Sequence, residues 1–168
     1  MPLTYDELPR EADERTMLTT FLQWQRATFE RKCEGLSHEQ LRMRALPPSR
    51  LSLLGLARHL ADDERGWLRR TLGGEEGLPG RFSTSEDPEA DFNAVEMCDV
   101  DEVFDAWREE CARGDRVIAG HQLDDVVQQR TGRRASMRWI LIHLVEEYSR
   151  HNGHADLLRE RIDGATGY

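Results

Sequence analysis

The stretch RWILIHLVEEYSRHNGHADLLRERID, residues 138–163, decides the fold expected for this chain. Its apolar side chains fall on one face of an α-helix, because they recur with the helical period. They are Ile140, Leu144, Tyr148, Leu158 and Ile162. Ser136 stands where a helix N-cap is expected, and Gly164 follows the last periodic residue. The pattern predicts a long helix that begins after Ser136 and runs to about Asp163.

The segment HLVEEYSRHNGH, residues 143–154, places polar groups on that apolar face. At about 100° per residue, Glu147 lies about 40° and His151 about 80° from His143, inside the apolar stripe. His143 and His154 lie at its edge, and Glu146 points to solvent. An ionised glutamate is costly to bury alone, so Glu147 needs a partner. Glu147 and His151 stand one turn apart and can reach one metal ion. The alternative is a Glu–His hydrogen bond, or an ion pair with an arginine from another helix.

Outward from this helix, the rest of the chain also has a helical period. A capping box of Thr4 and Glu7 predicts a first helix from about residue 5, ended by Gly35, and Ser37 starts a short helical turn. A second helix is expected over 51–72 and a third, capped by Asp99, over 100–121. Residues 73–99 read as a long crossover loop with room for a short strand, and TGRRA, residues 131–135, as a loop. No strand pattern competes with the helices.

These elements predict an all-α protein, a four-helix bundle with a long crossover between helices two and three. Residues 1–168 are expected to form a single domain, as the length of 168 residues suggests. Sites in such bundles are built from side chains that face inward from neighbouring helices.

The second helix, within LLGLARHLADDERGW (residues 53–67), offers a partner for Glu147 and His151. His59 falls at the edge of its apolar stripe. Small residues on the same face, at Ser52, Gly55 and Gly66, leave room beside the ring. Asp63 lies near this face as a fourth ligand, a supporting partner or a general base. A histidine packed in a helix without a metal is the plain alternative.

The amino-acid composition argues against several classes of function. The 32 acidic and 23 basic residues give a formal charge of −9, which argues against nucleic acid and anionic membrane as partners. No window holds the 18 or so apolar residues of a transmembrane helix, and the acidic N-terminus lacks the apolar run of a secretory signal. The cysteines, Cys33, Cys98 and Cys111, are odd in number and form no CxxC pair. They fit reduced thiols, so we expect a cytoplasmic protein.

The two motifs LLGLARHLADDERGW and RWILIHLVEEYSRHNGHADLLRERIDG together resemble the DinB-like (YfiT-like) metalloenzyme superfamily. The resemblance is closest to the actinobacterial branch that includes mycothiol-dependent maleylpyruvate isomerase. It implies a DinB-like bundle, with His59, Glu147 and His151 as ligands of one divalent metal ion. His154 stands where the superfamily has a glutamine, so the resemblance gives it no ligand role. Zinc is the favoured ion, with nickel or iron as alternatives.

The resemblance also implies a cosubstrate. The expected function is a metal-dependent enzyme that uses a low-molecular-weight thiol, mycothiol, for S-transfer to an electrophile or for isomerisation. Arg58 and Arg150 are the candidates to bind the cosubstrate, and the protein is expected to form a homodimer. Two alternatives stay open. One is a metal-dependent hydrolase with Asp63 as base, and the other is a non-catalytic binding module with a structural metal site.

Overall fold

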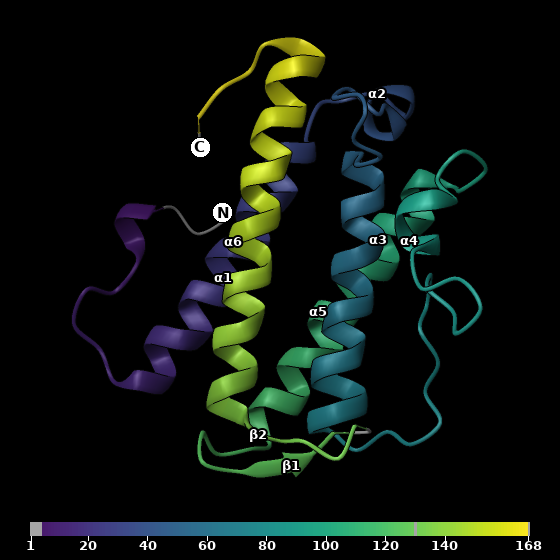
Figure 1. Cartoon of the computed structure of the whole chain (residues 1–168). Coiled ribbons are helices and arrows are strands. Elements are labelled where there is room, and N and C mark those ends of the chain that lie inside the picture. Colours follow the sequence, from purple (N-terminus) through teal and green to yellow (C-terminus); the bar gives the residue numbers. More distant parts are fainter. Residues whose placement is uncertain (1–4, 130, 168) are drawn as a thin grey trace.

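Four long helical segments form the bundle in the computed structural model, which describes residues 5–129 and 131–167 (Figure 1). They are α1 (Glu14–Cys33), α3 (Leu53–Glu64) continued by η2 (Arg65–Leu72), α5 (Val100–Ala119) and α6 (Met137–Asp163). The helix α6 packs against α1 and α3, and α3 also packs against α5. The prediction of an all-α bundle is confirmed.

The N-terminal prediction is wrong in its boundary. The first long helix begins at Glu14, not near residue 5, and Tyr5–Glu7 form only a turn of 3₁₀-helix, η1. Asp13 is the N-cap, and its side chain accepts a hydrogen bond of 3.0 Å from the amide of Thr16. Pro9 has no amide hydrogen and disfavours a continuous helix through this segment. The expected capping residue Thr4 lies outside the described residues.

The predicted second helix is continuous, but its winding changes from α-helical to π-helical. Its first part, α3, is α-helical, and from Arg65 the segment η2 is π-helical. The amide of Gly73 donates to the carbonyl of Leu68, five residues earlier, at 2.8 Å. Departures from α-helical to π-helical winding are frequent at functional sites.

The crossover between η2 and α5 is long, as expected, but it holds the short helix α4 (Ala90–Asn93) and no strand. It runs along the outer side of α3 (Figure 1). The Asp62 carboxylate on α3 accepts hydrogen bonds from the amides of Arg81, Phe82 and Ser83, at 2.5, 3.1 and 2.7 Å. The crossover is thereby fastened to the helix that carries His59.

A small hairpin before α6 departs from the prediction of a loop. Strands β1 (Val126–Gln128) and β2 (Arg134–Ser136) pair antiparallel, with Val127 opposite Ala135. Three residues per strand are too few to show a period in the sequence. The predicted short helix after Ser37 is present as α2 (His38–Arg42), with its full capping box.

The predicted limits of α6 are confirmed. The Ser136 side chain accepts a hydrogen bond from the amide of Trp139, and Gly164 follows the helix with φ of 79°. Its inward face is fully buried at Ile140, Leu144 and Tyr148, as the sequence period predicts. Within the described residues, no helix combines the length and apolar character needed to cross a membrane.

Candidate metal centre

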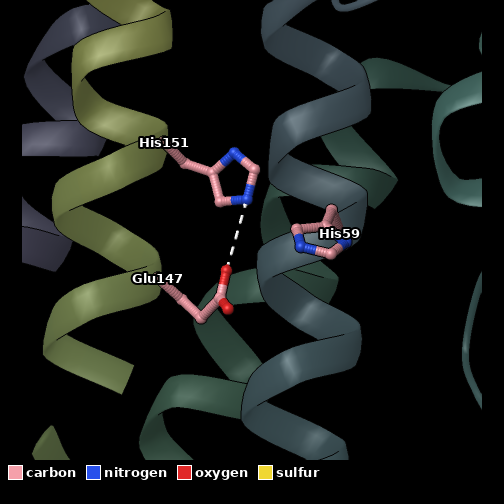
Figure 2. A group of neighbouring side chains, drawn as sticks. All are labelled: His59, Glu147 and His151. Atoms are coloured by element: carbon pink, nitrogen blue, oxygen red, sulfur yellow. Dashed lines mark ion pairs between the residues drawn. The ribbon is translucent and has the colours of Figure 1, made fainter. Parts of the chain in front are cut away.

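His59 from α3 faces Glu147 and His151 from α6 across the bundle (Figure 2). One ligating atom from each of the three side chains lies within 4.8 Å of the other two. The His151 Nε2 atom is 3.5 Å from Glu147 Oε2. The His59 side chain is 24% exposed, that of Glu147 13% and that of His151 9%, so the cluster is largely buried but reaches the surface.

Two carboxylates flank the His59 ring. Its Nδ1 atom lies 2.8 Å from Asp91 Oδ2, and its Nε2 atom lies 3.3 Å from Asp63 Oδ2. Burial disfavours the charged imidazolium, but the hydrogen bond to Asp91 and the charges of Asp63 and Asp91 raise the pKa of His59 above its usual value. The ring of Phe92 packs against His59 with centroids 4.9 Å apart.

Asp63 also lies beside His59, and few neighbouring groups stabilise the charge of its buried carboxylate. Burial raises the pKa of Asp63 to about 7; the nearby His59 opposes this shift, while Glu147 adds to it. Its Oδ2 atom is buried and makes no hydrogen bond to the described residues. A buried carboxylate oxygen without a donor is a costly feature unless a cation satisfies it.

His151 has the opposite electrostatic surroundings. Burial, followed by the proximity of His59 and His154, lowers the pKa of His151 to about 3. The ring is therefore neutral at physiological pH, which is the form that binds a metal ion. Its Nδ1 atom lies 3.3 Å from Nδ1 of His154.

The residues present fit a divalent cation. Two imidazoles and one carboxylate are the donor set of many catalytic zinc sites, which keep a fourth position open. Asp63 and Asp91 lie beside the His59 ring and Glu147 lies beside His151, and the Asp63 Oδ2 atom has no hydrogen-bond donor among the described residues. His59, Glu147 and His151 would hold the ion, with Asp63 beside it.

A second group of possible ligands, His143, Glu146 and Glu147, shares one carboxylate with this cluster. Arg150 donates a hydrogen bond to Glu146 and contacts Glu147 at 3.3 Å, so a cation already neutralises these carboxylates. The group is a helix-surface ion-pair network rather than a second metal site.

The two arginines predicted to bind the cosubstrate have different surroundings. Arg58 is buried and donates to the carbonyl oxygen of Ala94, and its guanidinium lies 4.9 Å from the Phe82 ring centroid. These contacts tie Arg58 to the crossover, and its contact with the cosubstrate stays a prediction. Arg150 is 53% exposed and lies at the rim, next to Glu147.

Asp91 is the site residue that the sequence did not predict. It lies in α4, within the crossover that has little period, and its side chain is only 5% exposed. The available signal was indirect, namely that a crossover of this length in a compact domain is often functional.

Comparisons with known proteins agree with the fold and specify the family. No curated protein matches the chain. Among solved structures, it is similar to a conserved protein from Enterococcus faecalis, with a TM-score of 0.70 and 14% identity over 92% of this chain and 100% of that one. That likeness shows the bundle alone. The family model for mycothiol-S-transferase matches residues 17–164, which include α3, α6 and every residue of the cluster. The chain therefore belongs to the mycothiol S-transferase family.

Proposed function

We propose that this protein is a divalent-metal-dependent transferase that conjugates the thiol of mycothiol to an electrophilic substrate. The observation that carries the proposal is the convergence of His59, Glu147 and His151, from two helices, in a largely buried cluster in a chain of the mycothiol S-transferase family. Zinc suits the donor set best, and nickel or iron use similar sets. A bound divalent ion would supply a strong reduction of the pKa of a coordinated thiol.

The thiol comes from the cosubstrate and not from the chain. Burial raises the pKa of the Cys33 and Cys111 thiols far above the usual value, so neither supplies a thiolate near neutral pH. Cys98 lies in the crossover, and its Sγ is 2.9 Å from the carbonyl oxygen of Ala94. None of the three is a member of the metal cluster.

Asp63 is the residue proposed to move the proton. Its Oδ2 atom makes no hydrogen bond and lies beside His59 Nε2, at the edge of the space that the ligands enclose. In the proposed step, Asp63 Oδ2 accepts the thiol proton and passes it to water. The thiolate sulfur then forms a bond to the electrophilic carbon, and the leaving group departs into solvent with the electron pair of the bond that breaks. The sulfur is neither oxidised nor reduced.

Arg150 is proposed to contact the polar groups of the cosubstrate at the rim. Its guanidinium is half-exposed and already lies over Glu146 and Glu147, so it can exchange one carboxylate contact for a ligand group. Next to it, Trp67, Trp139 and His143 form an aromatic wall, with ring centroids 4.6 to 5.2 Å apart. This wall offers an apolar surface to the electrophile.

The deciding experiment is calorimetric titration of the zinc-loaded protein with mycothiol, and with glutathione as a control. We expect mycothiol to bind, proton release on binding, and loss of binding in Glu147→Ala. A matched control is Glu146→Ala, which removes the neighbouring exposed carboxylate and should leave binding intact. Absence of binding by any low-molecular-weight thiol to fully loaded protein would overturn the proposal and favour a hydrolase or a structural site.

A further inference from the structure

Each imidazole of the cluster has two nitrogens, and an ion can take only one of them. Which nitrogen is available depends on the hydrogen bond that the other makes. In both rings the Nδ1 atom already has a neighbour within hydrogen-bond distance, and that neighbour is not one of the three ligands. In both rings Nε2 lies near a carboxylate oxygen, that of Asp63 for His59 and that of Glu147 for His151.

For His59 the neighbour is Asp91. A carboxylate can only accept, so at 2.8 Å from Asp91 Oδ2 the His59 Nδ1 atom carries the hydrogen. The lone pair of the neutral ring is then on Nε2, 3.3 Å from Asp63 Oδ2. Asp91 is itself held in place, because its Oδ1 atom accepts the amide of Phe92 at 2.9 Å. The Phe92 ring against His59 restricts rotation of the imidazole.

For His151 the neighbour is His154, one turn further along α6. The two Nδ1 atoms are 3.3 Å apart, so one of them must donate and the other must accept. If His151 donates, its Nε2 atom has a free lone pair and lies 3.5 Å from Glu147 Oε2. If His151 accepts, its hydrogen is on Nε2 and blocks the ion. A ligand role for His151 therefore requires His154 to be the acceptor, with its own hydrogen on Nε2.

We propose that Asp91 and His154 are positioning residues that keep the hydrogen of each liganding histidine on Nδ1 and thereby present both Nε2 atoms to the ion. The inference rests on the proposed metal site, but not on mycothiol or on any reaction. His154, which the family resemblance leaves without a role, thus gains one from its contact with His151. Outer partners of this kind contribute about 10- to 100-fold to metal affinity in other proteins.

The test uses variants that keep or remove the acceptor. In His154→Asn the amide oxygen can occupy the place of Nδ1, whereas His154→Ala has no acceptor; Asp91→Asn and Asp91→Ala form the second pair. Zinc affinity, measured by competition with a chelator, should fall about 10- to 100-fold in the alanine variants and be largely restored in the asparagine variants. His121→Ala, which removes a histidine that follows α5 and does not belong to the cluster, should bind zinc as the parent does.

A second readout needs no metal. Two-bond ¹⁵N–¹H correlation spectra of the metal-free protein report which nitrogen of each histidine carries the hydrogen. We expect the Nδ1–H form for His59 and His151 in the parent, kept in His154→Asn and shifted towards the Nε2–H form of free histidine in His154→Ala. Unchanged tautomers together with unchanged zinc affinity in both alanine variants would overturn the inference. If the parent binds no zinc, the proposed function fails, and the tautomer spectra still decide the positioning role. Circular dichroism of each variant separates a folding defect from either result, and an Asp91→Ala that fails to fold leaves the His154 pair to decide.

Discussion

Glu64 on α3 receives two hydrogen bonds from Arg26 on α1, at 2.7 and 2.6 Å, and its side chain is completely buried. The Tyr148 hydroxyl donates to the same carboxylate at 2.9 Å, and the Trp107 indole donates to Tyr148. One buried carboxylate thus joins four helices, and it directly follows Asp63 in the chain. The network fixes how α3 and α6 face one another, because Tyr148 is also the neighbour of Glu147.

Removing this carboxylate should cost much of the stability. We expect Glu64→Ala to lower the free energy of unfolding by about 3–5 kcal/mol, since it leaves the buried Arg26 guanidinium without its main partner. Glu146→Ala, which breaks an exposed pair with Arg150, should cost about 0–1 kcal/mol. Urea unfolding followed by circular dichroism measures both. Equal losses of unfolding free energy in the two variants would show that the buried network stabilises the fold no more than an exposed ion pair does.

The metal content of the protein should follow the three ligands. We expect one divalent ion per chain, and a clear loss in His151→Ala, because two remaining ligands hold an ion weakly. Elemental analysis of protein loaded and then desalted in parallel with the parent checks this. Glu146→Gln is the matched control, since Glu146 belongs to the neighbouring ion-pair network. Equal ion content in parent and His151→Ala would refute the assignment.

The cysteines should differ in reactivity. The thiolate is the reactive form, and burial raises the pKa of both Cys33 and Cys111, so their thiolate fraction stays small while pH rises through the usual range of a thiol. We therefore expect iodoacetamide at pH 8 to label Cys98 and to leave the other two until urea is added. Mass spectrometry of digested protein identifies the sites. Rapid labelling of Cys111 in the folded protein would contradict its raised pKa.

The crossover should loosen when its anchor is removed. The Asp62 carboxylate also accepts the Ser83 hydroxyl at 2.8 Å, in addition to three backbone amides. In Asp62→Ala these amides lose their acceptor, so we expect faster hydrogen exchange at Phe82 and Ser83, with unchanged exchange in α1. Zinc affinity should fall as well, because the same crossover carries Asp91. Hydrogen-exchange mass spectrometry gives the first result and chelator competition the second. Unaltered exchange over 81–84 would show that other contacts hold the crossover.

Assembly as a homodimer stays a prediction. Trp139, Ile142 and Leu157 on α6 are 46%, 51% and 56% exposed, so three large apolar side chains of one helix lie at the surface. Such exposure often marks a protein interface. Sedimentation velocity at micromolar concentration should show a dimer, and Ile142→Asp should weaken it. A parent protein that sediments only as a monomer would exclude this assembly.

The sequence by itself determined the helices and half of the site. Ser136, Asp99 and Gly164 set helix ends because a cap acts on backbone groups within a few residues of itself. Glu147 and His151 face inward together because a helix repeats about every 3.6 residues, so their relative direction follows from spacing alone. The same local reasoning was wrong at the N-terminus, where two possible helix starts compete. The helix begins after the N-cap Asp13 rather than near residue 5, because Pro9 disfavours a helix through the segment between them.

Only the tertiary structure decided which side chains contact the two histidines of the site. Asp91 reaches His59 because Asp62 and Arg58 fasten an irregular crossover to α3, while Arg44, in the loop before α3, donates to the carbonyl of Asn93. No period in the sequence encodes that path. The role of His154 likewise depends on ring orientation, since its place at the edge of the stripe did not say which nitrogen faces His151. Helix period and capping arise from interactions between near neighbours in the chain, whereas a buried carboxylate finds its donor through packing of distant segments, which spacing does not record.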